Sequence, residues 1–153
     1  MKKIVVLAAS VFLCTGGFVL DALAQGPMRW RGGGGWGPHG QYGRMYDPKT
    51  IETVTGQVLS IDQIMPRKGM GPGVHLQLKT DTETLSVHLG PRWYLEHQDM
   101  QIAAKDTIEV KGSRITFDGK PTLIAAEVRK GNETLVLRDA NGVPMWAGSR
   151  GRP

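Results

Sequence analysis

The chain has 153 residues, enough for one small domain, and a single cysteine, Cys14. Lysine and arginine number 19 against 14 aspartates and glutamates, a formal net charge of +5. Residues 46–148, however, carry 12 cations against 13 anions, so the positive excess lies in the ends of the chain. A nucleic-acid-binding domain usually concentrates positive charge on its folded part, and we therefore expect no nucleic acid as a partner.

Residues 1–24 have the pattern of a signal peptide. Lys2 and Lys3 precede a mostly apolar run, which ends in the small-x-small spacing of a signal peptidase site at Ala22-Leu23-Ala24. We therefore expect a secreted, periplasmic protein that begins at Gln25 and does not span the membrane after cleavage. Retention of the apolar run as a membrane anchor is the alternative. Cleavage also removes Cys14, so we expect no disulfide, no cysteine-bound zinc and no covalently attached haem.

Residues 25–45 are dominated by glycine and show no apolar periodicity. Such a segment has little apolar surface to offset the entropy lost on ordering, and we predict a flexible tether. Residues 148–153 are predicted to be a short disordered tail. The folded domain is then expected to cover residues 46–147.

The pattern between these ends is that of short strands. The first is β-branched and contains Gly56 and a slip in its apolar alternation, which together predict a bulged, bent strand. Pro91 opens a short predicted helix, and Asp118-Gly119 predicts a tight hairpin turn. The predicted strands are residues 53–61, 74–78, 85–89, 107–111 with 115–117, 122–128, and a last hairpin of 134–138 and 143–146; the helix is 91–98.

This order predicts an all-β fold, a small OB-like five-stranded Greek-key barrel. Its short helix lies between strands three and four, and a hairpin is added at the C-terminus. A bulged first strand could serve both halves of such a barrel. A small β-sandwich is the alternative.

Several stretches carry a resemblance to known proteins. TGQVLSID, KDTIEVKGSRITFDGKP and LIAAEV resemble bacterial periplasmic OB-fold proteins. With HLGPRWYLEHQ and LVLRDANGVPMW, the sequence is similar to the domain of magnetosome-associated MamS/MamX-type proteins over about residues 50–147. The resemblance implies a link to envelope or magnetosome redox and iron handling. Some relatives carry a CxxCH haem motif and this chain has none, so the resemblance implies no electron-transfer role and no catalytic residue here.

A pair of histidines is the most specific candidate site. A two-residue turn at Asp81-Thr82 places His75 directly opposite His88 on the outer face of two antiparallel strands. Two neutral imidazoles at that spacing could share a transition metal, with His97 as a third ligand. The competing interpretation is that these histidines are solvated surface positions.

The loop after the first strand is the second candidate. It is rich in methionine, glycine and proline, and in OB-like barrels such a loop borders the binding face. The candidate ligand-binding residues are Met65, Arg67, Lys68, Met70 and Gln77.

No serine elbow, cysteine–histidine pair or metal-hydrolase motif occurs, so we expect no enzyme and no resident cofactor. The expected function is a non-catalytic binding or accessory module of the cell envelope, with an envelope protein, a glycan or a small ligand as partner. The alternative function is metal handling (Cu, Fe or Zn) through the histidine pair, associated with redox or iron systems.

Overall fold

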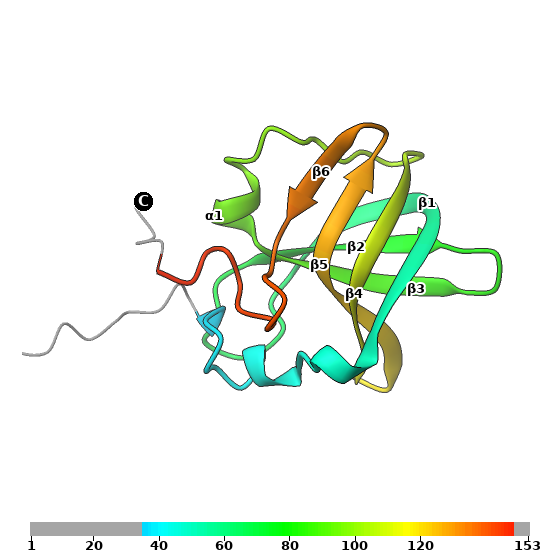
Figure 1. Ribbon diagram of the computed structural model, residues 1–153. Coiled ribbons are helices and arrows are strands. Elements are labelled where there is room, and N and C mark those ends of the chain that lie inside the picture. The colour runs from blue at the N-terminus through cyan, green and yellow to red at the C-terminus, as the bar shows by residue number, and fades with distance from the viewer. Residues whose placement is uncertain (1–34, 149–153) are drawn as a thin grey trace, which may run out of the picture. The chain divides into compact units, whose positions relative to one another are not determined.

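The computed structural model describes residues 35–148, which form an all-β fold with little helix (Figure 1). The predicted signal peptide and residues 25–34 and 149–153 lie outside this part. Two 3-10 turns, η2 (Gly43–Met45) and η3 (Pro48–Thr50), precede the first strand. The strands are β1 (Ile51–Ile64), β2 (Gly73–Lys79), β3 (Thr84–Pro91), β4 (Thr107–Phe117), β5 (Lys120–Lys130) and β6 (Glu133–Val136), and the helix is α1 (Arg92–Leu95).

The strands form one sheet in the order β3-β2-β1-β4-β5-β6, with all neighbours antiparallel. One further pairing joins strands at distant places in this order. Residues 86–88 of β3 run parallel to residues 122–124 of β5. The all-β class is therefore confirmed, and the sheet contains six strands.

The first strand is bent, as its sequence predicts. It is 14 residues long, and its pairing with β2 shifts register between Val58 and Ser60. Gln57 is the last residue of β1 to pair with β4, opposite Thr107, and also pairs with Lys79 of β2. From Leu59 onward β1 pairs with β2 alone. The bulge therefore lies close to the point where β1 changes partner, from β4 along its first half to β2 along its second.

The β2–β3 hairpin has the predicted register, with Leu76 opposite Val87 and Leu78 opposite Leu85. All four of these side chains are fully buried in the core. Alternation then places the intervening polar side chains on the opposite face of the hairpin. The predicted helix is also present, since the residues after α1 continue in hydrogen-bonded turns as far as Gln98.

The C-terminal hairpin is shorter than predicted. The β4–β5 turn forms at Asp118-Gly119 as predicted, and both residues have a positive φ (49° and 74°). In the C-terminal hairpin, however, β6 already ends at Val136. The predicted final strand at residues 143–146 is reduced to an isolated bridge between Arg138 and Pro144. Proline has no backbone N–H, so a regular ladder cannot continue through Pro144.

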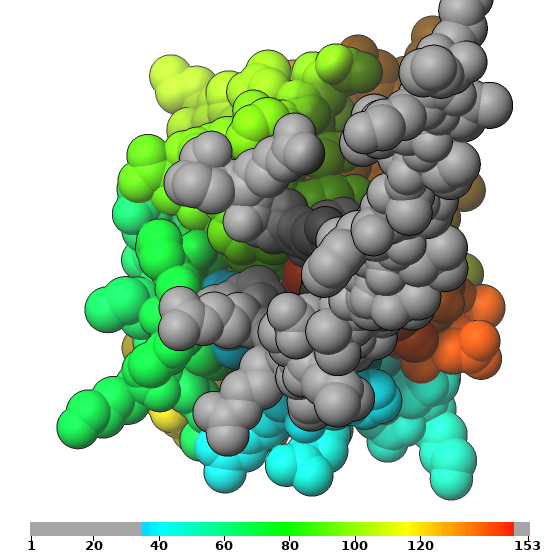
Figure 2. Space-filling view, turned by 90° about the vertical axis from the view of Figure 1, so that its left-hand side faces the viewer, coloured from blue at the N-terminus to red at the C-terminus, as the bar shows by residue number. Residues whose placement is uncertain are grey.

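The predicted tether is wrong for residues 35–45, which pack onto the sheet. Trp36 and Tyr42 are each only 1% exposed and belong to the hydrophobic core. The indole Nε1 of Trp36 donates to the Gly71 carbonyl at 2.9 Å, and that of Trp146 donates to the Trp36 carbonyl at 2.8 Å. Figure 2 accordingly shows cyan N-terminal residues bordering orange C-terminal ones. Aromatic side chains bury large areas, and this offsets the ordering entropy that the glycines impose.

Candidate binding site

A polar groove lies on the outer face of β2 and β3. Its volume is about 480 Å³. We call it the histidine groove; its lining residues are Ile64, His75, Gln77, Thr84, Ser86, His88, Phe117, Asp118, Lys120, Pro121 and Thr122. The β2 and β3 members are alternate residues, as expected for a groove that lies across one face of a hairpin.

The two histidines are neighbours in the groove. His75 pairs with His88 across the hairpin, and their ring centroids are 5.9 Å apart. The prediction that they lie on adjacent antiparallel strands, with side chains on the same face, is therefore confirmed. The prediction of solvated positions is wrong for His88, which is only 2% exposed. Tyr42 and Phe117 pack against its ring, with centroids at 5.9 and 5.1 Å.

His88 is held in place by Tyr42. The Tyr42 hydroxyl and Nδ1 of His88 share a buried hydrogen bond of 2.7 Å. Burial raises the pKa of Tyr42, so the phenol keeps its proton. Burial, assisted by the nearby His75, lowers the pKa of His88 to about 4. Both partners are therefore neutral near pH 7.

His97 does not join the pair. It lies on the exposed turn after α1, and its Nδ1 is hydrogen-bonded to the Trp93 carbonyl at 2.7 Å. Within residues 35–148 no group of three His, Cys, Asp or Glu side chains is placed to hold a metal ion. The structure thus brings together two of the three predicted metal ligands, and metal handling gains no support from this arrangement.

The predicted ligand-binding loop lies largely outside the groove. Met65 is 69% exposed, and Met70 packs against the core. Arg67 makes its side-chain contact with the sulfur of Met45, at 3.8 Å, and Lys68 is exposed. Of the five residues predicted in this group, Gln77 alone lines the histidine groove.

Two parts of the groove were not predicted from the sequence. Tyr42, behind His88, lies in the glycine-rich segment, where the recurrence of Trp36, Tyr42 and Tyr46 was the available signal. The wall at residues 117–122 follows from the parallel contact of β5 with β3. The Asp118-Gly119 turn was predicted, but nothing in its sequence indicates which strand it faces.

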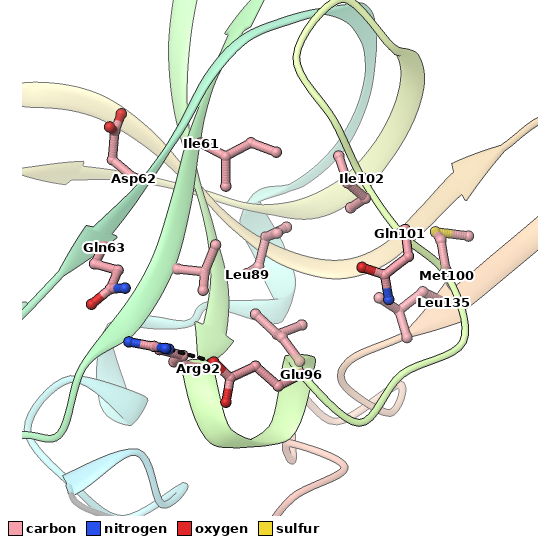
Figure 3. Close-up of a pocket in the computed structure, with 12 residues that line it drawn as sticks. Ile61, Asp62, Gln63, Leu89, Arg92, Glu96, Met100, Gln101, Ile102 and Leu135 are labelled. Atoms are coloured by element: carbon pink, nitrogen blue, oxygen red, sulfur yellow. Dashed lines mark hydrogen bonds and ion pairs between the residues drawn. The ribbon is translucent and has the colours of Figure 1, made fainter.

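A second groove lies beside α1, as the close-up in Figure 3 shows. Its volume is about 360 Å³, and we call it the α1 groove. An ion pair between Arg92 and Glu96 lies at its rim. Its apolar lining residues are Ile61, Val74, Leu89, Leu95, Met100, Ile102 and Leu135, and its polar ones are Asp62, Gln63, Arg92, Glu96 and Gln101.

Fold and grooves together define a small all-β protein with one groove over the β2–β3 hairpin, lined mainly by polar residues, and a second beside its helix, lined by both apolar and polar residues. The chain belongs to the MamS/MamX magnetosome protein family, which matches residues 50–135. The match runs from the end of η3 into β6, and it confirms the resemblance found in the sequence. A search among curated proteins found no match. Among the described residues, no helix has the length and apolar character needed to cross a membrane.

Proposed function

We propose that this protein is a non-catalytic accessory module of the cell envelope that serves a magnetosome system. It holds an envelope partner, which is a protein, a glycan or a small ligand, in the histidine groove. The observation that carries the proposal is the groove itself, a concave surface lined mainly by polar residues of two paired strands and of the β4–β5 turn. The family description supplies the link to magnetosomes, and the signal-peptide pattern of residues 1–24 supports a periplasmic location.

The strand pairings support an OB-like barrel as the scaffold. Following the pairs from β1 to β2, β3, β5, β4 and back to β1 closes a ring of five strands. In OB folds the face of strands two and three, with the loop between strands four and five, is a recurrent binding surface. The histidine groove occupies that place, between the β2–β3 hairpin and the β4–β5 turn.

The groove lining favours a neutral polar partner. Gln77, Thr84 and Ser86 offer hydrogen-bonding side chains, while Asp118 and Lys120 carry opposite charges. Phe117 is the one Phe, Tyr or Trp residue in the lining. A single-stranded nucleic acid would need several stacking aromatics and an excess of positive charge, so these residues favour a protein segment, a glycan or a small polar ligand.

The state of His88 supports binding over catalysis. A histidine acting as a general base needs a pKa near the working pH and an adjacent nucleophile. Here burial lowers the pKa of His88 to about 4, and its Nδ1 is engaged by a tyrosine that keeps its proton. We therefore assign His88 to the wall of the groove.

Photo-crosslinking in living cells tests the binding role. A benzophenone amino acid is placed at Lys120, an exposed residue of the groove, and in a second strain at Lys111, an exposed lysine of β4 outside it. We expect a discrete adduct from position 120 and none from position 111. Equal labelling from both positions, or none from position 120, would contradict the proposal.

A further inference from the structure

The second half of β1 has a free edge. Its last contacts toward β4 are the backbone bonds of Val58 with Asp106 and Lys105, at 2.8 and 2.7 Å. Beyond them residues 60–64 pair with β2 on one side, and within residues 35–148 no strand pairs with the other side. Backbone groups of a strand point alternately to its two edges, so this half presents N–H and C=O groups available to another strand.

The α1 groove runs along this edge. Ile61, Asp62 and Gln63 are consecutive in β1, and all three line it. Successive side chains of a strand point to opposite faces, so a groove over one face would be lined by alternate residues. Because three successive residues of β1 line the groove, the groove lies beside the strand. Figure 3 shows the chain around Gln101 and Ile102 on the side of the groove opposite β1.

The floor of the groove is apolar and its rim is acidic. Leu89, Met100 and Leu135 are at least 92% buried beneath it, whereas Ile61 at the rim is 37% exposed. The rim carries two carboxylates, Asp62 and Glu96, and one guanidinium, Arg92, which is paired with Glu96, so that its net charge is a single negative one at Asp62. A complementary segment therefore offers aliphatic side chains to the floor and basic side chains to the rim.

We propose that the α1 groove is a second docking site, which accepts an extended segment of a partner protein as a strand added to the edge of β1. The segment alternates aliphatic and basic residues. Its backbone pairs with residues 59–64, its aliphatic side chains enter the apolar floor, and its basic ones face the carboxylate of Asp62 at the rim. The site is separate from the histidine groove: of its lining residues, none also lines that groove.

The test is a titration of isotope-labelled protein with short synthetic peptides, followed by amide shifts and hydrogen exchange. The probe is acetyl-Lys-Val-Lys-Val-Lys-amide. Its matched controls are Glu in place of Lys, Ser in place of Val, and the Lys-Val sequence with N-methylated backbone. We expect the probe to shift and protect amides of residues 59–64, and each control to bind about tenfold more weakly.

Two variants localise the binding. Ile61→Lys places a cation in the groove, where it repels the basic probe and removes an aliphatic contact, and Val143→Lys alters a residue of similar exposure, 39% against 37%, outside it. We expect Ile61→Lys to weaken the probe about tenfold and Val143→Lys to leave it unchanged. Thermal melts check that both variants fold.

Three results would overturn the proposal. Equal binding of the N-methylated peptide would show that no strand is added, and equal binding of the Glu peptide would remove the role of the acidic rim. Protection of the same amides that rises with protein concentration, without peptide, would assign the edge to a second copy of this chain. Each result leaves the histidine groove and its function untouched.

Discussion

The hydroxyl of Tyr42 lies 2.7 Å from Nδ1 of His88, and this buried bond joins the N-terminal segment to the wall of the histidine groove. The two residues are 46 positions apart in the sequence. The geometry of the groove therefore depends on residues 35–45 as well as on the β2–β3 hairpin.

Removing this hydroxyl should destabilise the fold. Tyr42→Phe leaves Nδ1 of His88 buried without its partner, and we expect a loss of about 1–2 kcal/mol in the free energy of unfolding. Tyr94→Phe is the matched control, because among the described residues its hydroxyl makes no hydrogen bond. Urea denaturation measures both, and an equal effect of the two substitutions would remove the structural role of the bond.

The lowered pKa of His88 makes stability depend on pH. The folded protein binds this proton more weakly than the unfolded chain, whose histidine has a pKa near 6.5. The part of the free energy of unfolding that depends on His88 should be fully present above about pH 6.5. It should fall by about 3 kcal/mol as the pH drops to about 4, because the unfolded chain takes up this proton first. In His88→Gln the loss of free energy of unfolding over this pH range should be smaller by about 3 kcal/mol.

His97→Gln, at an exposed position outside the groove, is the control for the loss of a histidine as such. An identical pH profile for His88→Gln and the unmodified protein would mean that His88 titrates in the ordinary range. Denaturation midpoints across the pH series provide the measurement.

The packing of residues 35–45 can be tested at Trp36. Trp36→Ala should cost about 3–5 kcal/mol, since the side chain is 1% exposed and belongs to the core. Met65→Ala, at a residue 69% exposed, should change stability by less than about 0.5 kcal/mol. A tether would make both substitutions neutral, so a small effect at Trp36 would restore the tether interpretation.

The same packing requires a glycine at position 73. A Cβ there would run into Cζ2 and Cη2 of Trp36, so Gly73→Ala should destabilise by about 1–3 kcal/mol. A Cβ at Gly37 would meet no atom within 4 Å, and Gly37→Ala should be close to neutral. Thermal melts of both variants measure the difference. Similar melting temperatures would contradict the packing of Trp36 against position 73.

The β2–β3 hairpin was predictable because its pattern allows one register. Burying Leu76, Leu78, Leu85 and Val87 together leaves a single way to join the strands, and the position of His88 opposite His75 follows. The bulge in β1 was predictable for a similar reason, since the apolar alternation changes phase within the strand.

The burial of His88 was not predictable from local pattern. Alternation assigns it to the outer face, and its cover comes from Tyr42 and from Phe117, each remote in sequence. The glycine content of residues 25–45 also concealed the burial of Trp36, because composition averages over a segment while packing depends on a few large side chains.

Complementation tests the central claim, that the histidine groove is the working surface, most directly. In a magnetosome-forming host lacking this gene, we expect Gln77→Arg and Ser86→Arg, which place a large cation in the groove, to fail to restore magnetosome crystals counted by electron microscopy. Thr55→Arg, at an exposed position of β1 outside the groove, should restore them. Melting temperatures must show that all three proteins fold. Full restoration by folded Gln77→Arg and Ser86→Arg proteins would contradict the account.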